Sequence, residues 1–312
     1  MMMVGVLEDT MDESGHTEEK RLKTGVYGLD TIIGGGFREN TVNVVLGSSG
    51  AGKTTIAMQY LLYGLNRGES ALYLSLEMAE KYIVRECRQM GWNEIEDHIK
   101  SGSLKVLHKR GEEVLSISRE LSTDLLKIVE ETAEEGSRIV IDPLTHLTFL
   151  EDKTHRTYLS EVFNGLRELG TSLVLLEEPP FPASTDLTGE IFTPIYLADS
   201  VVHLQSLGFG ERYNRTMRIV KHRGSRHGEG LYPISIQRGL GVVAEVSEDE
   251  VESITPKTEY LDRFEDAKDR VREEGGDLKD ILIRRLEVLQ CNWTSDEDPS
   301  SVLEKFLDTE KE

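Results

Sequence analysis

Six short runs of continuously apolar, mostly β-branched residues recur along the first two thirds of the chain. They are residues 41–47, 70–76, 103–108, 137–143, 171–177 and 199–205. Strands with one face in water alternate apolar and polar side chains, whereas continuous apolar runs are typical of strands buried on both faces. The pattern therefore predicts a central sheet that is covered by helices on both sides.

Segments with apolar residues at helical spacing separate most of these runs. They are residues 53–68, 79–92, 112–136 and 154–170. Strands that alternate with helices indicate an α/β fold with a mainly parallel sheet. After residue 200 the pattern changes to strand following strand, which predicts antiparallel strands that extend the sheet.

The C-terminal part of the chain has the pattern of three short amphipathic helices. Their expected starts are Thr255, Asp277 and Asp298, of which the first and the third precede a proline that suits the first helical position. The residues expected to face inward are Leu261, Phe264 and Val271 in the first helix and Leu278, Ile281, Leu282 and Leu289 in the second.

The charge of the chain is strongly negative and uneven. The 312 residues carry a net charge of −21, of which residues 248–312 contribute −11, from 21 Asp and Glu against 10 Lys and Arg. This step suggests three parts: a flexible N-terminal tail at 1–22, an α/β domain at 23–247 and an acidic helical extension at 248–312. A net charge of this sign argues against non-specific binding of nucleic acid or anionic lipid.

Cysteine content and hydropathy indicate the compartment. Cys87 and Cys291, the only cysteines, lie far apart and have no metal-ligand spacing, as in proteins of a reducing cytoplasm. No apolar run approaches 18 residues, so we expect no membrane insertion. We therefore expect a cytoplasmic protein.

The stretch GSSGAGKT at residues 47–54 fulfils the pattern G-x-x-x-x-G-K-[ST] between an apolar run and a helical segment. Such glycines let backbone N–H groups point at phosphate oxygens, and the helix adds its positive N-terminal end. Lys53 would contact the β- and γ-phosphates of ATP, and the Thr54 hydroxyl would bind Mg²⁺. The residues expected to hold the nucleotide are Gly47, Ser48, Ser49, Gly50, Ala51, Gly52, Lys53, Thr54 and Thr55.

Two carboxylates follow apolar runs at the same expected edge of the sheet. Asp142 would bind Mg²⁺ directly or through water, or else cap the following segment. Glu77 would orient the attacking water, or else stabilise the first turn of the next helix. Glu177 and Glu178 are the next candidates for the water, whereas Glu80 is expected to be a solvated helix residue.

Four segments in this order resemble the KaiC-like ATPases of the RecA superfamily. They are residues 24–37, 72–92, 138–147 and 219–227, and the likeness extends over about residues 23–240. The resemblance implies a RecA-like P-loop domain that assembles with copies of itself into a ring, with a hexamer expected. It also implies that Lys221 and Arg223 act on the nucleotide of a neighbouring subunit and that His227 contacts that nucleotide.

The sequence departs from the family pattern in several places. The family often has two adjacent glutamates where this chain has Glu77 followed by Met78, which makes slow turnover plausible. Asn40 replaces a family glycine. The phosphoacceptor Ser-Thr pair of KaiC falls at Ile195–Tyr196, which argues against autophosphorylation of that kind, although Thr193 is near.

Three functions are consistent with these residues. The first is a regulatory or signalling ATPase that uses ATP and Mg²⁺, whose nucleotide state a protein partner reads through the C-terminal helices. The second is a nucleotide switch of low turnover in a motor complex, like the archaellum accessory ATPase. The third is a DNA recombination mediator, which the lack of any Lys or Arg from residue 168 to 211 disfavours.

Overall fold

The computed structural model describes residues 20–109, 121–147, 154–178, 192–209, 213–225, 227–246, 260–274, 279–291, 293 and 298–309. Within them, nine strands form one sheet in the order β11-β10-β9-β8-β3-β7-β6-β4-β5. The strands are β3 (Val42–Gly47), β4 (Ala71–Ser75), β5 (Leu104–His108), β6 (Arg138–Asp142), β7 (Thr171–Glu177), β8 (Ser200–Phe209), β9 (Tyr213–His222), β10 (Tyr232–Gln237) and β11 (Gly241–Ala244).

The sheet is parallel from β8 to β5 and antiparallel from β8 to β11. All six apolar runs form strands, and the antiparallel strands after residue 200 are also present, so the predicted α/β fold is confirmed. A separate pair of short strands joins β1 (Arg21–Leu22) to β2 (Phe37–Arg38). Strand β1 thus consists of two residues that the sequence placed in the N-terminal tail.

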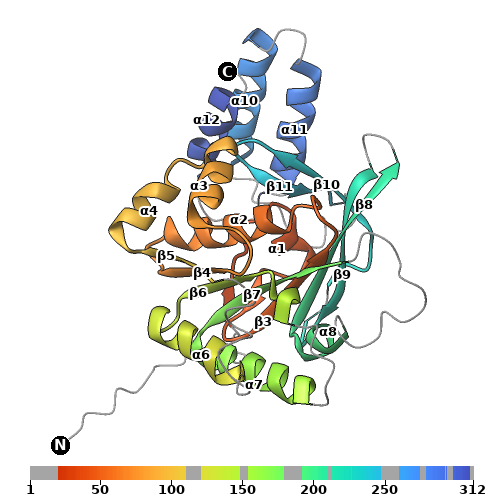
Figure 1. Ribbon diagram of the computed structural model, residues 1–312. Coiled ribbons are helices and arrows are strands. Elements are labelled where there is room, and N and C mark those ends of the chain that lie inside the picture. Colours follow the sequence, from red (N-terminus) through yellow and green to blue (C-terminus); the bar gives the residue numbers. More distant parts are fainter. Residues whose placement is uncertain are drawn as a thin grey trace, which may run out of the picture.

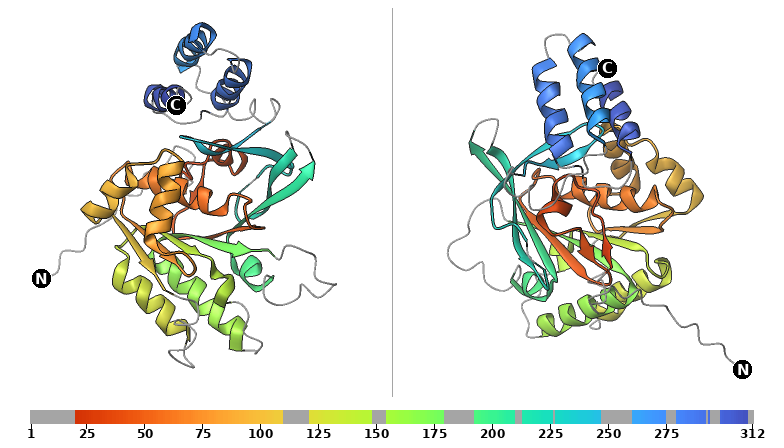
Figure 2. Two further views of the ribbon diagram at one scale, coloured as in Figure 1. Left: turned by 45° about the horizontal axis from the view of Figure 1, so that its top comes forward. Right: turned by 180° about the vertical axis from the view of Figure 1, so that it is seen from behind.

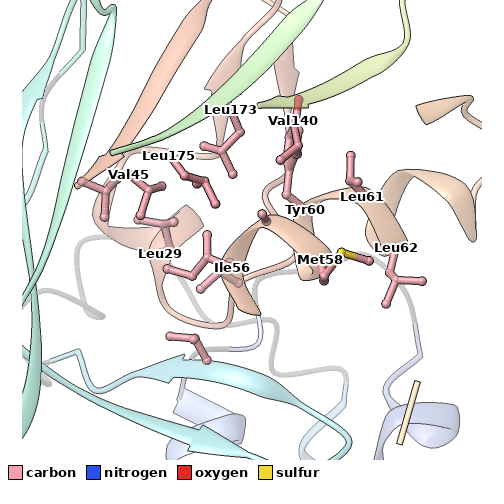
Figure 3. Close-up of a cluster of buried hydrophobic side chains, with 14 of the residues drawn as sticks. Leu29, Val45, Ile56, Met58, Tyr60, Leu61, Leu62, Val140, Leu173 and Leu175 are labelled. Atoms are coloured by element: carbon pink, nitrogen blue, oxygen red, sulfur yellow. The ribbon is translucent and has the colours of Figure 1, made fainter. Parts of the chain in front are cut away.

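Helices cover both faces of the sheet, as Figures 1 and 2 show. One face carries α1 (Leu29–Ile32), α2 (Lys53–Leu65), α3 (Glu80–Gln89) and α4 (Ile95–Ser101), and the other carries α6 (Leu121–Thr132) and α7 (Thr154–Leu169). Alternate residues of β3 serve the two faces, because Val45 packs in the cluster that contains Ile56 of α2 while Val44 packs in the cluster that contains Phe163 of α7. Figure 3 shows the first of these clusters around α2.

The C-terminal helices pack at the β11 edge of the sheet (Figure 1). They are α10 (Leu261–Glu274), α11 (Lys279–Cys291) and α12 (Ser300–Thr309), and they share an apolar cluster with Leu240 and Val243 of the sheet region. Of the residues expected to face inward, Phe264, Val271, Leu282 and Leu289 are buried. Leu261 and Ile281 are 40% and 52% exposed, so the prediction was wrong for these two.

Other expectations for the extension fall only partly on described residues. The predicted starts Thr255 and Asp277, and Leu278, lie outside them. At the third helix the Asp298 carboxylate accepts a hydrogen bond from the Ser300 N–H at 2.8 Å, as an N-terminal cap does. No helix among the described residues has both the length and the apolar character needed to cross a bilayer.

Candidate nucleotide-binding site

Three positions between the end of β3 and the start of α2 require glycine. Two of them require it because of their backbone angles, and the third because a neighbouring strand lies too close for a side chain. Gly50 and Gly52 have φ angles of +74° and +108°, in the left-handed region. A Cβ atom on Gly47 would lie 2.5 Å from the carbonyl oxygen of Leu204 on β8. Ser49 and Gly50 at the tip of the loop are exposed. The loop therefore presents open backbone directly before the first turn of α2.

Lys53, the first residue of α2, is buried and bonded to the loop itself. Its Nζ donates hydrogen bonds to the carbonyl oxygens of Gly47 at 2.8 Å and Ser48 at 2.9 Å. The same Nζ lies 2.5 Å from Glu177 Oε2 at the end of β7. Lys53 is thus paired with a carboxylate of its own chain.

Asp142 and Thr54 meet at the carboxyl edge of the sheet. Asp142 ends β6 opposite Ser75 of β4, and its Oδ2 accepts a hydrogen bond from Thr54 Oγ1 at 3.1 Å. Two adjacent ligands in an octahedral Mg²⁺ shell, at 2.0–2.1 Å from the metal, are about 3 Å apart. A hydroxyl and a carboxylate at this spacing fit a magnesium ion, so the residues present suit the metal that the sequence implied.

The Asp142 carboxyl group is perturbed by its surroundings. Burial raises its pKa, and hydrogen bonds from Tyr73 and Thr54 oppose that shift. The nearby charge of Glu77 raises the pKa further. A bound divalent cation would favour the ionised carboxylate.

Glu77 lies two residues beyond the end of β4 and is exposed. Two hydrogen bonds hold this turn in place, from the Leu76 N–H to the Asp142 carbonyl oxygen at 2.7 Å and from the Met78 N–H to Ser75 Oγ at 2.9 Å. Met78 packs against the apolar cluster around α2. The turn therefore leaves Glu77 near Asp142 while its neighbour in sequence faces the core. Glu80, the first residue of α3, is exposed as expected.

The other two acidic candidates also lie at the loop. Glu177 stands opposite Gly47 in the β3–β7 register, and its N–H donates to Thr145 Oγ1 at 2.6 Å. The Glu178 N–H donates to the Gly47 carbonyl oxygen at 3.0 Å, and its carboxylate lies 3.1 Å from His203 Nε2. Only Glu177 contacts the phosphate-loop lysine.

Lys221 and Arg223 lie toward the opposite end of the sheet from the loop. Lys221 of β9 is opposite Val201 of β8, and Val201 is opposite Val44 of β3, so Lys221 is level with the first half of β3. The Arg223 N–H donates to the carbonyl oxygen of Asp199, which itself bonds to Val42. The structure therefore does not bring these two cations to the P-loop of their own chain.

Both cations donate to the carboxyl end of α8 (Phe192–Leu197). Lys221 Nζ contacts the carbonyl oxygens of Ile195 at 3.2 Å and Tyr196 at 2.8 Å, and Arg223 Nη2 contacts that of Tyr196 at 3.2 Å. Burial, followed by the charge of Arg223, lowers the pKa of Lys221 to about 8. His227 follows in the same segment, with Nδ1 3.0 Å from the Gly228 carbonyl oxygen.

Two contacts of the loop region were not predicted from the sequence. Arg215 of β9 donates from Nε to the Gly50 carbonyl oxygen at 3.2 Å, and Tyr73 of β4 donates to Asp142. The Arg215 contact depends on the register of the β8–β9 pair, which no local pattern specifies. The contact of Tyr73 could have been expected, because a buried tyrosine in an otherwise apolar strand needs a hydrogen-bond partner for its hydroxyl group.

Buried Cys87 is not part of this site. Cys87, on α3, lies in the same apolar cluster as Ile56 of α2, and burial raises the pKa of its thiol to about 12. The side chain of Cys291 lies outside the described residues.

Comparisons with known proteins agree with the fold. A family model described as the KaiC ATPase matches residues 22–249. The circadian clock protein KaiC3 of Synechocystis is 28% identical over 78% of this chain, which spans 51% of that protein. A UPF0273 protein of Thermotoga maritima is 28% identical over 70% of this chain, and the match covers 93% of that protein.

A solved structure shows the same fold. It is the crystal structure of a KaiC-like protein from Pyrococcus horikoshii, with a TM-score of 0.57, 24% identity, and coverage of 72% of this chain and 98% of that one. The family model covers well over half of the sequence. The chain therefore belongs to the KaiC ATPase family.

Proposed function

We propose that this chain binds ATP with Mg²⁺ and hydrolyses it at the interface between neighbouring copies in a ring. The observation that carries the proposal is the separation of Lys221 and Arg223 from the P-loop. Arg223 is level with the start of β3, and five residues of strand, about 17 Å, lie between that level and Gly47. Cations so far from the loop do not reach a phosphate bound there, so any contact they make with a nucleotide would be with that of another subunit.

Within one chain, four side chains at the loop would bind the phosphates, bind the metal and orient the water. Lys53 exchanges its contact with Glu177 for the phosphates. Thr54 and Asp142 would hold Mg²⁺, which would neutralise charge on the phosphate oxygens. Glu77 is exposed beside Asp142 and orients the attacking water.

The neighbouring chain would supply Lys221 and Arg223, with His227 in the same segment. In the single chain these two cations donate only to backbone carbonyl oxygens of α8 among the contacts described. Phosphate oxygens are stronger acceptors for a cation than neutral carbonyl oxygens. The segment therefore has the chemistry to leave α8 for a nucleotide presented by the adjacent subunit.

Mixed assemblies test the shared site. Glu77→Gln subunits lack the residue that orients water, and Arg223→Ala subunits lack the cation supplied to the neighbour. Each variant alone is expected to be nearly inactive, because an arginine supplied across an interface contributes about 10³–10⁵ in rate. In mixed rings some interfaces pair an intact Glu77 with an intact Arg223, so ATPase activity should return.

Two controls keep the mixing experiment decisive. Size-exclusion chromatography with a labelled subunit verifies that the variants exchange into common assemblies. The unchanged chain should also gain specific activity with protein concentration as rings form. Activity independent of concentration, with no recovery in verified mixed assemblies, means that the cations do not act on a neighbour.

A second candidate function, a nucleotide switch of low turnover, is favoured by the acidic turn. The residue after Glu77 is Met78, which packs against the core, so this turn offers one exposed carboxylate for water. ATP affinity measured beside turnover separates the two functions. A switch binds tightly and turns over rarely, and the ring ATPase shows turnover that depends on assembly.

A further inference from the structure

A cavity of about 730 Å³ lies between the α/β core and the C-terminal extension. Its walls come from residues 23–30, from the carboxyl end of α2 and from α12. Ligand-binding cavities in proteins commonly measure 300–1,000 Å³. The cavity is therefore large enough for a small molecule that touches both the core and the extension.

The cavity is separate from the phosphate loop. Asn66, which lines it, directly follows α2, whereas Lys53 begins the same helix. The 13 residues of α2 place about 20 Å between these two ends. A molecule in the cavity would thus occupy a different place from a nucleotide on the P-loop.

Aromatic rings dominate the apolar part of the wall. The lining includes Tyr27, Tyr63, Trp92 and Trp293. The rings of Tyr27 and Trp293 are stacked with centroids 6.2 Å apart, and the Trp92 indole N–H donates to the Gly239 carbonyl oxygen at 3.2 Å. Rings held in place in this way are suited to pack against a planar aromatic ligand.

The charged groups of the wall favour an anion. Lys23, Arg67 and Lys305 contribute three cations, against the carboxyl groups of Asp30 and Glu94. Lys305 Nζ lies 3.2 Å from Glu94 Oε1, which ties α12 to the residues that precede α4. Burial raises the pKa of Asp30, and the charge of Lys23 and hydrogen bonds from Thr24 oppose that shift. In a chain of net charge −21, this cavity wall is locally positive.

We propose that the cavity binds a planar aromatic anion, with its rings among the tyrosines and tryptophans and its charge near Lys23, Arg67 and Lys305. Such a ligand would bridge the core and α12 and would be recognised independently of ATP. No residue of the P-loop takes part in binding this ligand.

The tryptophans provide a direct readout. The chain has two tryptophans, and both line the cavity. Protein labelled with 5-fluorotryptophan should therefore give two ¹⁹F resonances, assigned with Trp92→Phe and Trp293→Phe. The full chain is titrated with 2-naphthalenesulfonate and, separately, with the neutral 2-naphthalenemethanol. Both resonances should shift with the sulfonate, at an affinity roughly three- to tenfold higher than with the alcohol.

Charge variants locate the anion. Lys305→Gln and Lys23→Gln should each weaken sulfonate binding by roughly three- to tenfold and leave alcohol binding unchanged. Lys23→Gln serves as the second variant because it leaves the Lys305–Glu94 contact of α12 intact. Lys100→Gln on α4 is the matched control, since Lys100 is exposed and does not line the cavity.

Three results would overturn the proposal. The first is that neither ¹⁹F resonance responds to millimolar sulfonate. The second is equal affinity for the sulfonate and the alcohol with no effect of the two lysine variants, which describes an apolar cavity without anion recognition. The third is loss of sulfonate binding in Lys53→Ala, which would place the probe on the P-loop.

Discussion

The two ends of the sheet treat their cations differently. At the carboxyl end, Lys53 is buried and paired with the Glu177 carboxylate at 2.5 Å. At the amino end, Lys221 and Arg223 share the carbonyl oxygen of Tyr196. Lys53 is therefore paired with a carboxylate, whereas the hydrogen bonds described for the side chains of Lys221 and Arg223 go to neutral carbonyl oxygens. The charge of Asp199 also acts on Lys221 and opposes the lowering of its pKa.

The difference shows in how the charges respond to their surroundings. Burial and the neighbouring Arg223 lower the pKa of Lys221 to about 8, so its surroundings favour the neutral amine. An additional anion would relieve that cost. Under the proposed function, Lys53 exchanges an ion pair within its own chain for a phosphate, whereas Lys221 and Arg223 exchange neutral carbonyl oxygens for a phosphate of the neighbouring subunit.

Loss of Lys53 should have the largest effect on ATP binding. Lys53→Ala removes the cation that would contact the phosphates, and we expect ATP affinity to fall about 100-fold or more. Calorimetric titration with MgATP measures the affinity. Thermal unfolding is the control for the fold, because the variant also leaves Glu177 without its partner. ATP binding at the affinity of the unchanged chain would contradict the assignment of the loop.

Glu77→Gln should separate binding from turnover. The amide keeps the size of the side chain but is a poor proton acceptor, so turnover should fall about 10²–10⁴-fold while ATP remains bound. Steady-state phosphate release and nucleotide affinity are measured on the same preparation. Glu80→Gln, three residues further on the exposed face of α3, is the matched control. Unchanged turnover in Glu77→Gln would transfer the role to Glu177 or Glu178.

The charge of Lys221 should make the ATPase activity depend on pH. Lys221 loses its charge as the pH rises through its pKa of about 8, so an activity that needs this cation decreases above that pH. We expect kcat/KM for ATP to fall by up to about tenfold per pH unit above 8, because this parameter reports ionisations of the free enzyme. Lys221→Arg stays charged throughout this range and should flatten the decrease. The same decrease in both proteins would assign it to another group.

Local patterns predicted most of the fold. Strands such as β3 and β7 were found because both of their faces are buried, so their apolar runs are continuous. The four residues of β11 are too few to show a pattern in the sequence. Leu261 and Ile281 were misplaced because a helical repeat gives the apolar face but not how far the neighbouring elements extend over it.

The candidate site was only partly visible in the sequence. The P-loop is a contiguous stretch, and Asp142 and Glu77 follow buried strands, so position along the chain was enough to name them. The contacts of Lys53 with Glu177 and of Gly50 with Arg215 join distant segments through strand register. Register is set by the packed sheet as a whole, and a single sequence does not display it.

The smallest predicted effect concerns the ion pair between Lys53 and Glu177. Glu177→Gln removes the carboxylate that is paired with Lys53. A larger fraction of the nucleotide-free molecules then has the lysine available for phosphate. Apparent affinity rises in proportion to that fraction, and we expect ATP to bind about three- to tenfold more tightly. Glu178→Gln is the matched control, because Glu178 contacts His203 rather than Lys53. Titration of MgATP into both variants measures the difference, and the Glu177 effect should shrink at high salt because the carboxylate is 39% exposed. Equal affinity of the two variants would mean that the Lys53–Glu177 contact does not compete with nucleotide, and that the two ends of the sheet differ less than their contacts indicate.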